Sequence, residues 1–212
     1  MKWEEFVKLT DNLPVIDSEM LLVGVVNPSS VKVQLDRWRK SGKLIQIRRG
    51  IYILAKPYRK LDIYEPYLAS IVKSPSYVSL EKALEFHNLI PEAVSIYTCI
   101  TTKRPYKFVS KLGIFDYRHI KQSLFWGYES VTVNKQTGFI ACPEKALLDF
   151  FYLREVKVSF DYIEELRLEN LEKINLEKLF VFAKRFNKPG ILRDAKMIKE
   201  YIELEIKKEK LL

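Results

Sequence analysis

The stretch that decides the expected fold is residues 27–54, which read NPSSVKVQLDRWRKSGKLIQIRRGIYIL. Its first residues are typical of a turn and a helix start, and Gly42 is typical of a helix end. Val31, Leu35 and Trp38 recur at positions i, i+4 and i+7, so on a helix they form one apolar stripe. The sequence therefore predicts a helix up to about Gly42 that packs on its neighbours through this stripe.

The same stretch continues as an expected β-hairpin. Leu44–Arg48 and Ile51–Leu54 are rich in β-prone residues, and Gly50 between them supplies the positive φ that a tight turn needs. Two shorter helical patterns precede the stretch, one over residues 3–13 and one that begins at Ser18 as its N-cap. Three short helices followed by a basic two-stranded ribbon predict a winged helix-turn-helix.

Positive charge is concentrated in this region. The chain has a formal net charge of +9, and residues 28–60 alone hold ten lysines and arginines against one carboxylate, Asp36. A focused positive region is typical of a nucleic-acid contact. An ordinary solvated basic surface is the alternative.

We expect DNA contacts from the helix face opposite the apolar stripe and from the hairpin tip. The residues predicted to contact DNA are Ser29, Ser30, Lys32, Val33, Arg37, Lys40, Lys43, Arg48 and Arg49. Arg37 is suited to bidentate pairing with guanine, whereas the serines and Val33 suit base edges and thymine methyls. The lysines suit phosphates, and the two hairpin arginines suit the adjacent minor groove. Asp36 on the same face would repel phosphates, unless it pairs with Lys40 or accepts from a cytosine amine.

A polar, turn-prone segment over residues 55–64 marks the expected domain boundary, which gives domains 1–58 and 59–212. The second domain reads as mixed α/β with flanking helices, so the fold class is α+β. Helices are expected at 62–72, 79–88, 143–153, 161–169, 175–187 and 190–208, and strands at 96–101, 112–120, 130–134 and 137–142.

A second basic patch lies in the C-terminal part. It consists of Lys103, Arg104, Lys107 and Lys111, interleaved with Tyr106 and Phe108. Cations interleaved with aromatic rings can bind RNA or single strands by stacking. A solvated loop is the equally favoured alternative.

The residue pattern offers little for catalysis, and we expect no catalytic residue, no metal and no cofactor. His87 and His119 are the only histidines, and neither has metal-ligand spacing with other ligands. A glycine-rich phosphate loop is absent from the sequence. The tripeptide at residues 205–207, Glu-Ile-Lys, resembles a nuclease element, but such tripeptides are common by chance.

Several other polar residues are expected to be structural. Ser79 is interpreted as an N-cap, and Tyr77 and Tyr117 as aromatics at the core edge with hydrated hydroxyls. In the segment 143–149 (PEKALLD), a helix start explains the residue types without a binding role. The two cysteines suit buried positions in a reducing compartment.

Blocks along the chain resemble the AbiEi family of type IV antitoxins, also described as abortive-infection regulators. These blocks cover roughly residues 20–190 and read VQLDRW (33–38), SGKL (41–44), RRGIY (48–52), SYVSLEKAL (76–84), LIPE (89–92), TTKRP (101–105), YRHI (117–120), GY (127–128), PEKALLD (143–149) and LRLENL (166–171).

This resemblance implies a winged-helix domain that represses its own operon by binding inverted repeats in the promoter. It also implies a C-terminal domain that counteracts a separately encoded nucleotidyltransferase toxin, often without a stable complex. We therefore expect a phage-defence antitoxin that is not an enzyme, with the second basic patch contributing to antitoxicity. A stand-alone regulator whose C-terminal domain dimerises or senses a ligand is the alternative, and the oligomeric state, a homodimer included, is left open.

Localisation follows from hydropathy. The sequence holds no apolar run near the roughly 20 residues that cross a bilayer. Its first residues, Met1–Glu5, lack the apolar core of a signal peptide. We therefore expect a cytoplasmic protein without a membrane partner.

Overall fold

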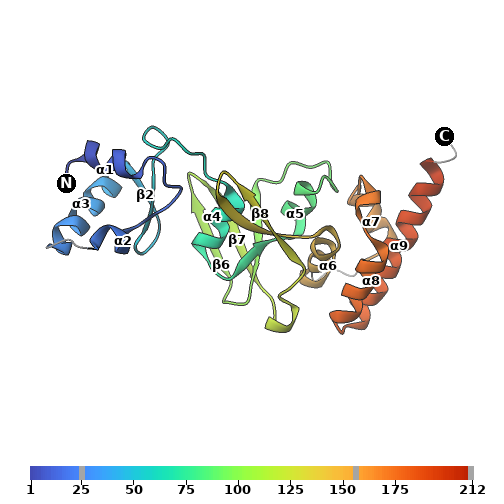
Figure 1. Cartoon of the computed structure of the whole chain (residues 1–212). Helices are drawn as coiled ribbons and strands as arrows, with labels where there is room; N and C mark the ends of the chain where they lie inside the picture. The colour runs from blue at the N-terminus through green and yellow to red at the C-terminus, as the bar shows by residue number, and fades with distance from the viewer. Residues whose placement is uncertain (24–26, 155–157, 210–212) are drawn as a thin grey trace. The chain divides into compact units, whose positions relative to one another are not determined.

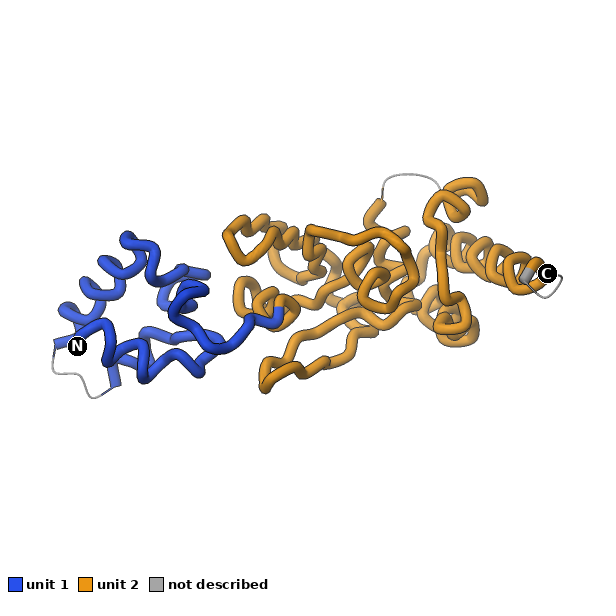
Figure 2. Tube along the Cα trace, turned by 90° about the horizontal axis from the view of Figure 1, so that it is seen from above, with its two compact units in different colours: residues 1–64 blue, residues 65–212 orange. Residues whose placement is uncertain are grey.

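The computed structural model describes residues 1–23, 27–154 and 158–209 (Figure 1). The chain divides into two compact units, Met1–Tyr64 and Glu65–Leu212, coloured separately in Figure 2. The sequence-based boundary at 58/59 lies a few residues earlier. Each unit is described by itself.

Unit 1 contains short helices and a small antiparallel sheet. Its elements are α1 (Trp3–Thr10), β1 (Ile16–Asp17), α2 (Ser18–Leu22), α3 (Pro28–Lys40), β2 (Leu44–Arg48) and β3 (Ile51–Leu54). The strand order is β1-β3-β2. The helices and the hairpin were predicted, whereas the two-residue strand β1 was not.

The helix ends of unit 1 follow from local hydrogen bonds. Asn27 caps α3 by accepting from the Ser30 N–H at 3.3 Å. The N-cap of α2 is Asp17, whose carboxylate accepts from the Glu19 N–H at 2.8 Å, so the expectation that Ser18 caps this helix was wrong. Ser18 is instead the first residue of the helix.

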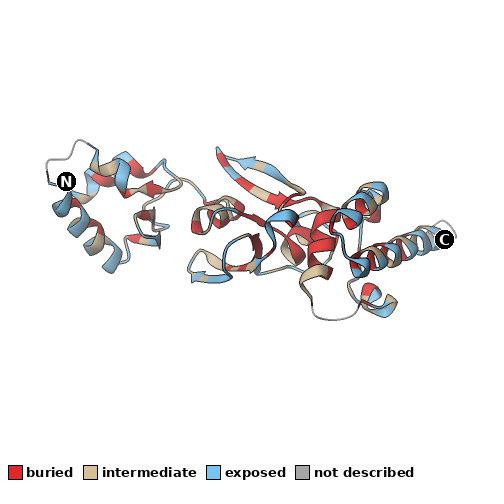
Figure 3. Ribbon diagram, turned by 90° about the horizontal axis from the view of Figure 1, so that it is seen from below, coloured by how far each residue is buried: buried red, intermediate tan, exposed pale blue. Residues whose placement is uncertain are grey.

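The predicted apolar stripe of α3 is confirmed as part of the unit 1 core. Val31 and Leu35 are buried, and Trp38 packs partly buried against the same cluster. The Trp38 ring meets the Trp3 ring edge-on, with centroids 4.9 Å apart. The opposite face of α3 is exposed, as the colouring of Figure 3 shows.

The β2–β3 turn needs glycine for two reasons. Gly50 has φ +81°, a conformation that side chains disfavour. A Cβ at this position would also lie 3.2 Å from the Ser18 hydroxyl oxygen. The predicted glycine turn is thus confirmed, and it places Arg48 and Arg49 beside the turn.

Unit 2 is built around a mixed sheet with strand order β6-β7-β5-β4-β9-β8. Its strands are β4 (Ser76–Val78), β5 (Ile96–Thr101), β6 (Tyr106–Ser110), β7 (Gly113–His119), β8 (Tyr128–Val133) and β9 (Gln136–Ala141). Strand pairs β5–β7 and β4–β9 are parallel, and the other pairs are antiparallel. Strands β4 and β6 were not predicted.

Helices of unit 2 lie on the sheet and beyond it (Figure 1). They are α4 (Glu65–Val72), α5 (Leu80–Phe86), α6 (Pro143–Leu153), α7 (Phe160–Glu165), α8 (Leu176–Arg185) and α9 (Pro189–Glu209), with short 3-10 helices η1 (Gln122–Leu124) and η2 (Leu171–Lys173). Each α-helix corresponds to a predicted one, with ends shifted by a few residues. The structure is therefore mixed α+β.

Alternation along β4 distributes its side chains to the two faces of the sheet. The Ser76 hydroxyl donates to the Ala69 carbonyl of α4, on one face. The Tyr77 hydroxyl donates to Asp149 of α6, on the other face. This short strand thus links a helix on each side.

In the part of the chain that the structure describes, no helix is both long and apolar enough to cross a membrane.

Candidate functional site

The face of α3 opposite the core carries the predicted DNA-contacting residues. Ser29, Ser30, Lys32, Arg37 and Lys40 are all exposed. Val33 is also exposed, at 50% of its surface, although it is apolar. The helix thus presents hydroxyls, one apolar side chain and cations together on its open side.

Asp36 is the single carboxylate of this face, and it is neutralised within the helix. Its two oxygens bind Arg39 at 2.7 Å and Lys40 at 2.8 Å. Hydrogen bonds from Lys40 and Arg39 hold the pKa of Asp36 below its ordinary value. The predicted pairing with Lys40 is therefore confirmed, and Arg39 adds a second partner that the sequence analysis did not name.

The remaining predicted cations differ in exposure. Arg48 and Arg49 are exposed beside the Gly50 turn. Lys43 is only half-exposed, and its ammonium lies 5.0 Å from the centre of the Trp3 ring. The phosphate role of Lys43 stays a prediction, as do the roles of the other residues.

The second basic patch lies on the edge strand β6 and in the segments directly before and after it. Lys103, Arg104, Lys107 and Lys111 are exposed. Successive residues of a strand point to opposite faces, so Tyr106 and Phe108 share one face and Lys107 faces the other. Tyr106 packs near Tyr117, and Phe108 near Phe115, each pair with ring centroids 6.2 Å apart.

The stacking role of the patch stays a prediction. Both rings lie near rings of β7, and 47% of the Tyr106 surface is exposed. The cations themselves remain available for charge contacts. A contribution to antitoxicity stays a prediction that concerns Lys103, Arg104, Lys107 and Lys111.

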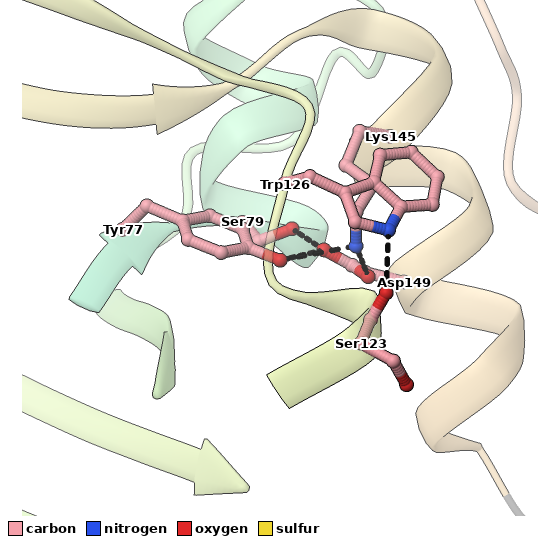
Figure 4. A network of polar contacts seen from close by, with 6 residues as sticks. All are labelled: Tyr77, Ser79, Ser123, Trp126, Lys145 and Asp149. Carbon is pink, nitrogen blue, oxygen red and sulfur yellow. Dashed lines mark hydrogen bonds and ion pairs between the residues drawn. The ribbon is translucent and has the colours of Figure 1, made fainter. Parts of the chain in front are cut away.

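A buried polar network joins strand β4, Ser79 and helix α6 in unit 2 (Figure 4). Asp149 of α6 accepts from the hydroxyls of Tyr77 and Ser79, each at 2.9 Å, and forms an ion pair with Lys145. The Lys145 ammonium also donates to the Tyr77 hydroxyl at 3.0 Å. Lys145, Asp149 and Ser79 have no exposed surface, and Tyr77 has 1%.

Burial and pairing act on this network in opposite directions. Burial raises the pKa of Asp149 and lowers the pKa of Lys145, because both charged forms lose water. The ion pair opposes both pKa shifts, and the Tyr77 and Ser79 hydroxyl donors further oppose the rise in the pKa of Asp149. Enclosure of all four side chains makes the network a structural element, since no substrate reaches it.

Three sequence-based interpretations are corrected here. Ser79 occupies the N-cap position of α5, but its hydroxyl bonds to Asp149 and not to the helix backbone. Tyr77 and Tyr117 were expected to carry hydrated hydroxyls, yet both are buried, and Tyr117 donates to the Ala69 carbonyl at 2.7 Å. The three hydroxyls bind partners far along the chain, Asp149 and the Ala69 carbonyl, and not the helix backbone or water that the sequence suggested.

Backbone strain lies next to the network. Leu80, which follows Ser79 directly, has φ +53°, although it is not glycine. A side chain in this region costs about 1–2 kcal/mol. Leu80 is fully buried, so this strained residue is enclosed by packing directly after the Ser79 hydroxyl that donates to Asp149.

The histidines are engaged by backbone carbonyls. His87 donates from Nε2 to the Ala141 carbonyl at 2.7 Å, and His119 donates from Nδ1 to the Lys103 carbonyl at 3.2 Å. Among the described residues, no group of three or more histidines, cysteines and carboxylates could hold a metal ion.

Comparison with known proteins adds no relative: the chain matches no family model and no curated protein sequence.

Proposed function

We propose that unit 1 is a winged helix-turn-helix that binds double-stranded DNA, and that the protein is an autoregulating antitoxin. The observation that carries the DNA proposal is the exposed basic face of α3 together with the arginines of the β2–β3 turn. Neutralisation of Asp36 by its helical neighbours removes the one feature of that face that opposes phosphate binding.

The order of elements in unit 1 supports this proposal. A helix, a short strand, two helices and a β-hairpin follow one another, and β1 closes the small sheet beside β3. In a DNA-bound helix-turn-helix, the first residues of the second helix of the motif, which is α3 in this proposal, lie closest to the bases. Ser29, Ser30 and Val33 occupy that part of α3, and an exposed valine suits a thymine methyl.

The antitoxin part of the proposal rests on the resemblance to the AbiEi family. In this proposal, unit 1 represses the operon at promoter inverted repeats, and unit 2 counteracts a nucleotidyltransferase toxin encoded by a neighbouring gene. A stand-alone regulator remains the competing function. Enzymatic activity is not part of the proposal.

DNA binding is tested by the salt dependence of affinity. Fluorescence anisotropy would measure binding to the promoter inverted repeat between about 50 and 200 mM salt. Arg48→Gln with Arg49→Gln removes two cations from the proposed DNA interface, so the log–log slope should fall by about 1.8 if each neutralises one phosphate charge. Lys2→Gln with Lys8→Gln is the matched control, because it removes the same charge from α1 and its N-cap.

Base readout requires a different variant. Arg37→Gln should weaken binding to the promoter more than binding to unrelated DNA, with discrimination reduced by about 1–3 kcal/mol. An unchanged slope in the hairpin variant together with unchanged discrimination in the Arg37 variant would refute the interface.

Antitoxicity is tested by co-expression with the neighbouring gene product. The full-length Arg37→Gln, Arg48→Gln variant should lose repression of the promoter and still restore growth. Failure of the wild-type protein to restore growth would reject the antitoxin function and favour the stand-alone regulator.

A further inference from the structure

Two adjoining hollows open where α8 turns into α9. One encloses about 320 Å³ and is lined by residues of η1, α6 and the α8–α9 turn. The other encloses about 420 Å³ and lies against the start of α9. Both are lined by Tyr152 and Lys188, so they share a wall.

The smaller hollow is lined by unpaired cations. Lys121, Arg185 and Lys188 all border it, and all are exposed. Within the described residues, none of these three forms an ion pair with a carboxylate. These three cations give the hollow a positive potential that attracts anions.

The larger hollow adds two cations that are already paired, Arg154 and Arg193, and one lining carboxylate, Asp194. Arg154 binds Glu81 at 3.2 Å, and Arg193 binds Asp194 at 3.2 Å. The free cations therefore lie on the side of Lys188, and the balance over both hollows is positive.

Aromatic rings hold two of these cations at the wall. The Arg185 guanidinium lies 4.3 Å from the centre of the Trp126 ring, and the Lys188 ammonium lies 4.5 Å from the centre of the Tyr152 ring. A side chain that is already ordered loses less conformational entropy when a ligand binds. The Arg185 and Lys188 side chains are therefore preorganised for anion binding.

The start of α9 contributes further positive potential to the larger hollow. The first turn of this helix contains no acidic residue, and Lys188 directly precedes it. The N-terminus of a helix carries a partial positive charge. Gly190 lines the hollow, and a Cβ there would meet no atom within 4 Å, so the backbone is open to a ligand.

We propose that these hollows bind a small polyphosphate anion, such as the triphosphate of a nucleotide. This inference goes beyond the proposed antitoxin function and does not depend on it. The volumes lie in the range of about 300–1,000 Å³ typical of small-molecule sites. Arginine and lysine are the side chains that bind phosphate oxygens most strongly. Nonspecific single-stranded RNA binding uses a basic groove that follows the nucleic-acid backbone, whereas here the cations border two local hollows at one turn of the chain.

The first test is calorimetric titration of the full-length protein with inorganic triphosphate at constant ionic strength. Arg185→Gln with Lys188→Gln should weaken binding at least about tenfold, since two charge-assisted contacts are lost. Lys184→Gln with Lys196→Gln is the matched control: these exposed lysines lie in α8 and α9, on either side of the same turn, but line neither hollow. Equal affinities of the two double variants would overturn the proposal.

A second pair of variants keeps every cation. Gly190→Glu places a carboxylate in the first turn of α9, where it suits the helix dipole and competes with the anion. Gly190→Ala makes the same backbone change without the charge. Triphosphate affinity should fall in the glutamate variant and remain in the alanine variant, while both variants stay folded. Retained binding in the glutamate variant would overturn the proposal.

A local readout identifies where the anion binds. The chain has three tryptophans: Trp3, Trp38 and Trp126. The Trp126 indole N–H donates to the carbonyl of Ser123, and Ser123 lines the smaller hollow. Triphosphate should shift the Trp126 indole signal in a nitrogen–proton correlation spectrum and leave those of Trp3 and Trp38 in place. Shifts confined to Trp3 and Trp38 would assign the anion to the basic face of unit 1. Shifts induced by single-stranded RNA and not by triphosphate would equally refute the proposal.

Discussion

Removing one partner of the buried Lys145–Asp149 pair should destabilise the protein strongly. Lys145→Met keeps a side chain of similar length but leaves the Asp149 carboxylate enclosed with only two hydroxyl donors, from Tyr77 and Ser79. Breaking a buried pair in this way typically costs about 3–5 kcal/mol.

Protonation of Asp149 limits the loss in free energy of unfolding. The ordinary pKa of an aspartate is 3.8, so holding Asp149 protonated at pH 7 costs about 4.4 kcal/mol at 1.36 kcal/mol per pH unit. A larger loss would require damage to the packing, because the uncharged acid can still accept from Tyr77 and Ser79. The expected loss for Lys145→Met is therefore about 3–4.4 kcal/mol.

The sign of the pH dependence separates this explanation from a simple packing defect. Burial raises the pKa of Asp149, so the native state of Lys145→Met binds a proton that the unfolded state has released. Its stability is therefore greatest at low pH and is lost as pH rises through the native pKa. Between pH 7 and pH 5 the variant should regain up to about 2.7 kcal/mol relative to the wild type.

The reciprocal variant should show the opposite slope. Asp149→Asn leaves Lys145 buried without its carboxylate, and burial lowers the pKa of this ammonium. A group with a lowered pKa loses its stabilising contribution as pH falls through the native pKa. Asp149→Asn should therefore be more stable at pH 9 than at pH 7, relative to the wild type.

Urea unfolding followed by circular dichroism measures these stabilities. The double variant Lys145→Met, Asp149→Asn removes both charges and keeps an acceptor for the Tyr77 and Ser79 hydroxyls, so it should exceed either single variant in stability. Losses under about 1 kcal/mol with no opposing pH slopes would refute the reasoning.

Two further predictions concern glycine packing and thiol burial. Gly138→Ala should lower the free energy of unfolding by about 1–3 kcal/mol, because its Cβ would lie 2.5 Å from the Pro66 Cβ and push β9 from α4. Gly190→Ala, whose Cβ meets open space, is the matched control, and equal urea midpoints would contradict this explanation. Burial raises the pKa of the Cys99 and Cys142 thiols, so both should react with a disulfide reagent at pH 8 only after unfolding. Rapid labelling of the native protein would show that this burial is incomplete.

The parts of the fold that the sequence predicted are those fixed by local spacing. The stripe of Val31, Leu35 and Trp38 needs only helical periodicity, and the Gly50 turn needs only a left-handed residue between two β-prone runs. Both are confirmed because their partners lie within unit 1. The exposed face of α3 then follows as the complement of the buried stripe.

The parts that were missed depend on distant partners. Ser76–Val78 is too short for an alternation signal, and it becomes a strand because β5 and β9 pair with it on either side. Ser79 was read from its neighbours as a cap, although Asp149 competes for the hydroxyl from 70 residues away. The cations of the α8–α9 turn were also missed, because Lys121 joins Arg185 and Lys188 only in three dimensions.

The wide sequence separation of the Ser79–Asp149 bond has a consequence for biosynthesis. During translation, unit 1 has every strand of its sheet once Leu54 has emerged from the ribosome. Strand β4 can pair on one side only after β5 has been made, and on the other side only after β9 has been made. The Ser79 hydroxyl lacks its Asp149 acceptor until α6 has been made. Domains generally fold as units, starting from the N-terminus. The nascent chain therefore carries the basic face of unit 1 before Asp149, the partner of Tyr77 and Ser79, has been made. During this interval, the incomplete core of unit 2 is accessible to chaperones and proteases.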